Sequence, residues 1–248
     1  MKIEISRRVD YTDVNPVFRL KLGVLFRYLQ AAAVEHSERV GLGSQSLVGE
    51  RTVWVLNKIG AIIHRYPTYR EDIRIVSWHR GKKGLKAYRD FRVFSKEECL
   101  VEAASMWLYL DLDQRKLKKI PPKMDQAYTV EPDATNVDVD EWTPKFVSAD
   151  KELRITTRYS DFDPLGHVNN TIFFDFIETL SQKAFKGNTH IRHIMIQFQK
   201  EILEIAVPIT LGIQTSGDGG RFKIFDHDNV FAMGDLRMGI EPLETLKE

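Results

Sequence analysis

Two stretches of the chain place apolar residues at the three- and four-residue spacing of an amphipathic helix. The first covers residues 22–36 and the second covers residues 172–184. This spacing gathers the apolar side chains on one side of a helix, where another element can cover them. We therefore predict helices over about 21–39 and 170–186.

Runs of alternating or mostly apolar residues, typical of β-strands, accompany each helix. Turn-forming residues separate several of them, as at 66–68 and 217–220. The predicted strands are 2–11, 53–63, 72–78, 86–94 and 101–110 in the first half, and 152–159, 191–198, 208–214, 221–225 and 230–238 in the second. One long helix with antiparallel strands, found twice, predicts an α+β fold in which each half wraps a sheet around its helix.

The two halves also share a short motif. Residues 11–16 (Tyr-Thr-Asp-Val-Asn-Pro) match residues 159–164 (Tyr-Ser-Asp-Phe-Asp-Pro), so residue 13 corresponds to residue 161, an offset of 148 residues. The helical patterns that follow keep this register. A repeat of this length indicates a duplicated domain.

The copies differ in their chemistry. The second copy continues as Gly-His-Val-Asn-Asn over 166–170, whereas the first has Phe-Arg-Leu-Lys-Leu over 18–22. We therefore predict a non-catalytic, substrate-binding domain over 1–122 and a catalytic domain over 151–248. The proline-containing, partly acidic stretch 123–150 is predicted to be the linker.

Composition adds mainly exclusions. The hydrophobic content of 43% and charged content of 29% are those of a globular protein, and a formal net charge of +1 gives no reason to expect nucleic-acid or membrane binding. The charged, alternating first residues resemble a strand and not a signal peptide. A single cysteine, Cys99, excludes an intramolecular disulfide and favours the cytoplasm.

The densest chemistry lies in the loop 159–170, which carries Asp161, Asp163, His167, Asn169 and Asn170 directly before the second helix. Its residues favour turns and helix caps, and backbone N–H groups at a helix start suit a developing oxyanion. A helix cap with a solvated histidine is the alternative. The other histidines, His36 among them, have no metal-binding spacing and are predicted to be surface or strand residues.

The loop and the helix-in-sheet halves resemble the hotdog fold, and the two-copy chain resembles the acyl-acyl carrier protein (acyl-ACP) thioesterases. The resemblance covers nearly the whole chain, and the family belongs to the tandem (double) hotdog α+β class. Outside the loop it is carried by Trp-Val-Leu-Asn-Lys-Ile at 54–59, His-Arg-Tyr-Pro-Thr-Tyr at 64–69, the strand at 72–78, Ala-Ser-Met-Trp-Leu-Tyr-Leu-Asp at 104–111 and Arg-Lys-Leu-Lys-Lys-Ile-Pro at 115–121.

The resemblance also implies site residues. The family loop reads Asp-x-Asn-x-His-Val-Asn-Asn, which Asp163, His167, Asn169 and Asn170 match; Leu165 stands where the family has the internal asparagine. A family Glu-Cys pair falls on residues 201–202, where Glu201 matches and Ile202 replaces the cysteine. The family nucleophile cysteine is therefore absent at this position.

A carboxylate and imidazole site acting on water remains, with Asp163, His167 and Glu201 as catalytic residues and Asn169 and Asn170 binding substrate. No metal and no cofactor is expected, since a thiol is a good leaving group. Strand alternation from Ile194 onward would turn Glu201 away from the apolar face, while Glu204 shares the apolar parity. Glu204 therefore remains open as the base.

The implied function is hydrolysis of acyl-ACP to release free fatty acid, a lipid-metabolism reaction of fatty acid biosynthesis, with acyl carrier protein as partner. An acyl-CoA thioesterase and a non-catalytic acyl-binding protein are the alternatives, and a homodimer is an open arrangement. The acidic carrier would need a basic patch, for which Arg80, Lys82, Lys83 and Lys86, or residues 115–119, are candidates. The acyl tunnel is predicted in the first half, lined from 31–33 and 54–63.

Overall fold

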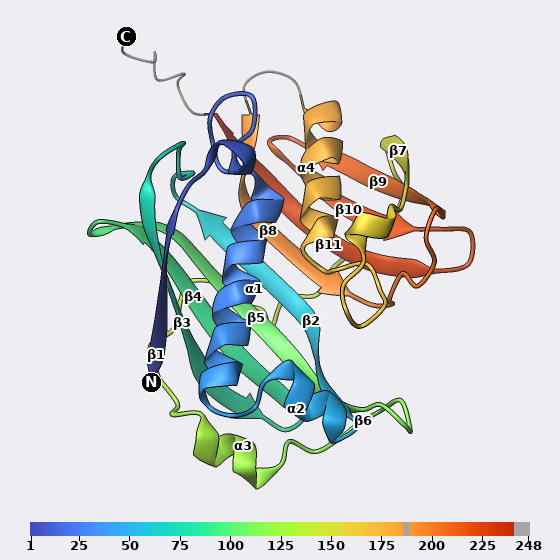
Figure 1. Cartoon of the computed structure of the whole chain (residues 1–248). Coiled ribbons are helices and arrows are strands. Elements are labelled where there is room, and N and C mark those ends of the chain that lie inside the picture. The colour runs from blue at the N-terminus through green and yellow to red at the C-terminus, as the bar shows by residue number, and fades with distance from the viewer. Residues whose placement is uncertain (186–188, 241–248) are drawn as a thin grey trace. The chain divides into compact units, whose positions relative to one another are not determined.

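The computed structural model describes residues 1–185 and 189–240 and divides the chain into two compact units, Met1–Trp142 (unit 1) and Thr143–Glu248 (unit 2). Each unit has one long helix against an antiparallel sheet (Figure 1). Of the helices in the described residues, none has the length and apolar character needed to span a membrane.

Unit 1 carries the first copy of the repeat. Its strands are hydrogen-bonded in the order β1-β3-β4-β5-β2, with β6 pairing to β5. The elements are β1 (Lys2–Arg8), the 3₁₀ helix η1 (Tyr11–Asp13), α1 (Leu22–Arg39), α2 (Ser44–Gly49), β2 (Thr52–Ile63), β3 (Asp72–Lys83), β4 (Lys86–Ser95), β5 (Glu98–Asp111), β6 (Lys116–Leu117) and α3 (Pro122–Ala127).

Unit 2 repeats this connectivity. Its strand order, β7-β9-β10-β11-β8, is the order of unit 1 with each strand replaced by its counterpart. The elements are β7 (Lys151–Thr156), η2 (Tyr159–Asp161), α4 (Ile172–Ala184), β8 (Thr189–Phe198), β9 (Pro208–Ser216), β10 (Gly219–Phe225) and β11 (Val230–Ile240). The predicted duplicated α+β fold is confirmed. Residue 186, the predicted end of the second helix, lies outside the described residues.

The two helices form for the reason that the spacing predicts. In α1 the side chains of Leu22, Leu25 and Leu29 are almost fully buried, one turn apart, and the helix packs against β3 and β1. In α4, Phe173 and Ile177 occupy the same positions, and the helix packs against β9. Each such side chain contributes about 1.5–3 kcal/mol by leaving water.

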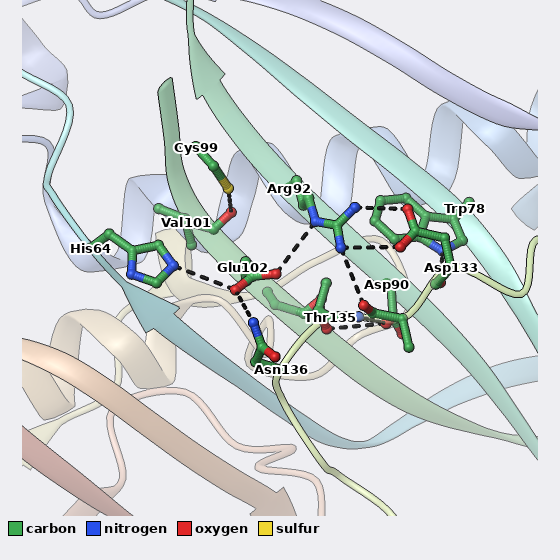
Figure 2. A network of polar contacts seen from close by, with 12 residues as sticks. His64, Trp78, Asp90, Arg92, Cys99, Val101, Glu102, Asp133, Thr135 and Asn136 are labelled. Atoms are coloured by element: carbon green, nitrogen blue, oxygen red, sulfur yellow. Dashed lines mark hydrogen bonds and ion pairs between the residues drawn. The ribbon is translucent and has the colours of Figure 1, made fainter. Parts of the chain in front are cut away.

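The stretch predicted as a linker contains a segment that is part of unit 1. Asp133 accepts hydrogen bonds from Arg92 Nη1 at 2.7 Å and Nη2 at 3.1 Å (Figure 2). Asn136 donates to Glu102 Oε2 at 2.8 Å, and Thr135 donates through its backbone N–H to a carboxylate oxygen of Asp90 at 2.9 Å. These bonds fix residues 133–136 onto β4 and β5.

This segment covers the face of the sheet that α1 does not cover. On β4, Arg89 contacts His36 of α1, so the alternate positions Asp90 and Arg92 point to the other face. Figure 2 shows their side chains directed at Asp133 and Thr135.

A buried histidine lies on the helix face of the same sheet. His36 is 0% exposed, and its Nδ1 accepts a hydrogen bond from Arg89 Nη1 at 2.9 Å, while Arg89 also donates to Ser77 Oγ at 3.0 Å. Burial, with the nearby positive charge of Arg89, lowers the pKa of His36 to about 4. The prediction of His36 as a surface or strand residue is wrong, because the apolar face of α1 takes this side chain inside.

We expect His36 to make the stability of unit 1 sensitive to acid. The unfolded chain binds a proton at the ordinary histidine pKa of about 6.5, before the folded state does at about 4. Stability is therefore full above pH 6.5 and falls as the pH approaches 4, by at most about 3 kcal/mol. Urea unfolding at several pH values should show a smaller loss for His36→Gln, whose amide oxygen can still accept from Arg89.

His227→Gln is the matched control, because the His227 side chain is 97% exposed. It should keep the wild-type pH dependence. If the free energy of unfolding of His36→Gln falls with decreasing pH as steeply as that of the wild type, the expected role of His36 is contradicted.

Candidate functional site

The loop before α4 is anchored by a buried carboxylate. Asp161 is 1% exposed, and its Oδ2 accepts the backbone N–H of Arg158 at 2.8 Å. Its Oδ1 accepts from Arg158 Nε and Nη2 at 3.0 and 2.8 Å. In the first copy, Asp13 Oδ2 accepts the backbone N–H of Asp10 in the same way, at 3.1 Å. Asp161 therefore makes the turn.

A closed turn then carries the residues of interest. The backbone N–H of Asp163 donates to the carbonyl of His167 at 3.0 Å, and that of Gly166 donates to the carbonyl of Asp163 at 2.9 Å. Gly166 has a φ of +84°, a left-handed conformation that glycine adopts without strain. Phe162 and Val168 close the loop through an isolated β-bridge.

The turn brings Asp163 and His167 together. Asp163 Oδ2 lies 3.6 Å from His167 Nδ1, and Asp163 Oδ1 accepts the backbone N–H of Leu165 at 2.9 Å. His167 Nδ1 also lies 3.1 Å from the carbonyl oxygen of Val168. Because a carbonyl only accepts, this contact requires a proton on Nδ1, which leaves Nε2 of the neutral ring as an acceptor. Both side chains are largely buried, at 13% and 15% exposure.

Glu201 approaches the other side of the imidazole. The backbone N–H of Val168 donates to the carbonyl of Ile202 at 3.0 Å, which holds the segment after β8 beside the loop. Glu201 Oε1 lies 4.0 Å from His167 Nε2, and its side chain is 57% exposed. The distance is too long for a direct hydrogen bond but allows a shared water.

Strand alternation does not decide between the two glutamates, because β8 ends at Phe198. Residues 201–207 follow an irregular path, so the parity of the strand no longer applies to them. Glu204 is exposed, its carbonyl accepts from Thr157 Oγ1 at 3.0 Å, and in the described part of the chain its carboxylate has no ion pair with the loop. The geometry favours Glu201.

The two asparagines lie differently. Asn169 Nδ2 donates to Asp163 Oδ2 at 3.3 Å, and Asn169 Oδ1 accepts the backbone N–H and the hydroxyl of Thr171 at 2.9 and 2.7 Å. Asn169 thus fixes the turn at Thr171 directly before α4 and holds Asp163. The half-buried side chain of Asn170 has no partner within residues 1–185 and 189–240, so its amide is free to meet a ligand.

Thr171 is a site residue that the sequence reasoning missed. Its spacing of two residues from Asn169 is the signal that could have found it, since Asn side chains commonly accept backbone N–H groups at that distance.

The two departures from the family pattern, one in the loop and one at the Glu-Cys pair, lie in different surroundings. The Leu165 side chain is 52% exposed, whereas Ile202 is 3% exposed. Cys99 lies in β5 of unit 1, where its Sγ contacts the carbonyl of Val101 at 3.7 Å. Among the residues described, no group of three or more His, Cys, Asp or Glu side chains could hold a metal ion. The assembled groups are thus two carboxylates, an imidazole and an amide.

Comparison with known families matches both halves. The chain matches the acyl-ACP thioesterase N-terminal domain over residues 2–128 and the C-terminal domain over residues 145–224. It is 25% identical to a chloroplastic palmitoyl-acyl carrier protein thioesterase of Gossypium hirsutum, over 71% of this chain and 46% of that protein. It is 26% identical to a chloroplastic acyl-[acyl-carrier-protein] hydrolase of Cuphea viscosissima, over 79% and 51%. The chain spans about half the length of these curated relatives.

Solved structures match over almost their full length. An acyl-ACP thioesterase from Bacteroides thetaiotaomicron has a TM-score of 0.85 at 20% identity, covering 96% of this chain and 98% of that one. The 12:0-ACP thioesterase from Umbellularia californica has a TM-score of 0.84 at 18% identity, covering 97% and 98%. At these identities the likeness shows the fold, which is the tandem hotdog.

We expect the closed turn to depend on the left-handed residue at 166. An added Cβ at Gly166 would meet nothing within 4 Å, so any cost of Gly166→Ala comes from the backbone. Urea unfolding should show a loss of about 1 kcal/mol for Gly166→Ala. Gly166→Asn should lose less, because asparagine tolerates this conformation.

Gly49→Ala is the matched control. Gly49 also has open space around its Cβ position but lies in helix α2 without a positive φ. It should be neutral or stabilising. Equal losses at both positions would contradict a conformational role for Gly166.

Proposed function

This chain belongs to the acyl-ACP thioesterase family, and on that premise we propose that it hydrolyses the thioester of acyl-ACP to release free fatty acid. The observation that carries the proposal is the position of His167, with Asp163 against Nδ1 and Glu201 facing Nε2. Thioester hydrolysis needs a base for water, a route for a proton to the thiolate and an oxyanion partner. All three are available beside the start of α4.

In the proposed reaction, Glu201 acts as the general base. Its exposed carboxylate takes a proton from a water that also contacts His167 Nε2. The water oxygen forms a bond to the thioester carbonyl carbon. The π electron pair of the C=O bond moves to the carbonyl oxygen, which becomes an oxyanion. The amide of Asn170 and N–H groups at the start of α4 would stabilise this oxyanion.

In the tetrahedral intermediate, an electron pair of the oxyanion then re-forms the C=O bond. The carbon–sulfur bond breaks, and its electron pair leaves with the sulfur as a thiolate. The proton taken from water passes through His167 to the departing thiolate, so that fatty acid and free thiol result. Asp163 holds the imidazole and offsets its positive charge while it carries this proton. Asn169 keeps Asp163 in place.

We further propose that unit 1 receives the acyl chain. Support comes from its first copy of the loop, which lacks the histidine, and from the buried apolar side chains Ala32, Ala33, Ile59 and Ile63. The same side chains also pack the core of unit 1. Replacing Ala33 with a larger residue and assaying acyl chains of several lengths would show whether the preference shifts.

The substitutions Leu165 and Ile202 favour one competing function, a protein that binds acyl groups without hydrolysing them. Purified protein should be assayed on acyl-ACP and on acyl-CoA with acyl chains of several lengths. Turnover of acyl-ACP above acyl-CoA is the expected result. Turnover of acyl-CoA alone would favour an acyl-CoA thioesterase, and no turnover would favour the binding protein.

We expect Asp163→Asn, His167→Ala and Glu201→Gln each to lower kcat/KM, because each removes base or proton-transfer capacity while keeping the fold. A positioned acid–base group typically contributes about 10²–10⁴-fold, which sets the expected range. Glu204→Gln is the matched control and should retain activity. Full activity in Glu201→Gln together with loss in Glu204→Gln would make Glu204 the base.

We expect Cys99→Ser to leave kcat near the wild-type value. Burial raises the pKa of the Cys99 thiol, which disfavours the thiolate that a nucleophile needs. Alkylating reagents should likewise leave the rate unchanged when measured with the same substrate. A large loss of kcat in a normally folded Cys99→Ser protein would overturn the water mechanism.

A further inference from the structure

The sequence of unit 1 contains two basic clusters, at residues 80–86 and 115–119. In the structure they differ in how many of their charges are paired with acidic side chains. In the first, Lys86 Nζ and Lys83 Nζ lie 2.6 and 3.3 Å from the two carboxylate oxygens of Asp140. Arg80 Nε lies 3.2 Å from Asp90 Oδ1. The Lys86 hydrogen bond, followed by one from Tyr88, lowers the pKa of Asp140, which therefore stays charged. Acidic side chains of unit 1 thus already offset most of this cluster.

The second cluster surrounds the short strand β6. Residues 115–119 are all exposed, and Arg115, Lys116 and Lys119 have no ion pair or hydrogen bond from their side chains within the described residues. The nearby acids are already occupied by other cations: Asp111 by Lys118 at 3.2 Å, Asp113 by Arg51 at 2.7 Å and Glu50 by Lys123 at 2.5 Å. Within the part of the chain that the structure describes, these three positive charges therefore have no counter-charge.

An apolar side chain lies among these charges. Leu117, the last residue of β6, is 49% exposed, and in the sequence it stands between Lys116 and Lys118. We name Arg115, Lys116, Leu117 and Lys119 the β6 patch. Exposed positive charge around one apolar residue is the complement of an acidic surface with an apolar centre.

Backbone hydrogen bonds and a hydrophobic contact hold the segment that carries the β6 patch. Asp111 Oδ1 accepts the backbone N–H groups of Asp113 and Gln114 at 3.0 Å each, which shapes the turn before β6. After β6, Lys118 N–H donates to the carbonyl of Tyr109 at 2.8 Å, and Ile120 enters a hydrophobic cluster. In Figure 1, β6 and α2 lie at the same end of unit 1.

The edge of β6 faces solvent. On β5, residues 110–111 pair with β2 on one side, so β6 must pair on the other side, beyond the end of β4. Lysines on an exposed edge strand also prevent edge-to-edge association. Glutamate would serve that purpose equally well, so a change of charge sign separates the two roles.

We propose that the β6 patch is the docking surface for the acidic carrier protein that presents the acyl thioester. The proposal rests on the proposed function and names the surface through which its substrate is held. Attraction between exposed charges acts over about 8–10 Å at moderate ionic strength and weakens as salt is added. Docking through this surface therefore has a salt dependence that a carrier-free thioester lacks.

The experiment compares two triple charge reversals. The test variant is Arg115→Glu/Lys116→Glu/Lys119→Glu. The control is Arg7→Glu/Arg70→Glu/Lys96→Glu, which changes the same number of exposed charges elsewhere on unit 1. Kinetics are measured on acyl-ACP and on acyl-N-acetylcysteamine at several salt concentrations. Circular dichroism and thermal unfolding establish that both variants are folded.

We expect the test variant to raise KM for acyl-ACP roughly tenfold or more, with kcat unchanged and acyl-N-acetylcysteamine hydrolysis at the wild-type rate. Added salt should lower wild-type kcat/KM for acyl-ACP and have little such effect on the variant. The control should behave as wild type. Leu117→Ser, which changes no charge, should also raise KM for acyl-ACP.

A wild-type KM in the test variant, or an equal rise in the control, would overturn the docking surface and leave the hydrolase function standing. If the wild type hydrolyses neither thioester, the proposed function fails, and fluorescence anisotropy with labelled holo-ACP decides docking alone. Binding lost only in the test variant would support the surface. Equal binding by both variants, or no binding by the wild type, would overturn it.

Discussion

The closed turn between Asp163 and His167 is the constraint on which the candidate site depends. Two backbone hydrogen bonds, at 3.0 and 2.9 Å, and one left-handed residue place the two side chains against each other. The first copy has the same turn 148 residues earlier: Asn15 N–H donates to the Arg19 carbonyl at 2.8 Å and Phe18 N–H to the Asn15 carbonyl at 2.9 Å. Phe18 adopts the left-handed conformation there, with a φ of +58°. Backbone bonds do not depend on side-chain identity, so this turn can be kept while its chemistry changes.

Asn15 in the first copy corresponds to Asp163 in the second. Comparing the two separates the contribution of the side-chain oxygen to the turn from the contribution of the negative charge. Asn15 Oδ1 accepts the backbone N–H groups of Val17 and Arg19 at 3.1 Å each, much as Asp163 Oδ1 accepts that of Leu165. An amide oxygen can therefore brace the turn. It cannot offset the charge of a protonated imidazole, and in the first copy arginine takes the place of histidine. Under the proposed mechanism, the negative charge at 163 is needed only beside His167.

Periodicity and short spacing predict the helices, the duplication and the dense loop at 159–170, and the family resemblance selects Asp163 and His167 within that loop. Prediction from the sequence fails where tertiary packing decides. His36 continues the helical spacing of residues 22–36 and lies inside for that reason, but its contact with Arg89 of β4 has no signal in a single chain. For Glu201 only the strand alternation misleads, because β8 ends at Phe198 and alternation cannot reveal that end; the family resemblance selects Glu201.

The stretch between the two repeats shows most directly how packing overrides composition. Its prolines and acidic residues are typical of a linker, yet a sheet with a helix on one face leaves the other face open to water. In unit 1, residues 133–136 cover that face through Arg92, Asp90 and Glu102. In unit 2, Phe146 and Ala149 lie over Gly212 of β9, where an added Cβ would come within 3.1 Å of Ala149 Cβ. Polar residues of this stretch thus pack on strands of unit 1, and Phe146 and Ala149 pack on β9 of unit 2, so a connection with the composition of a linker has partners in each unit.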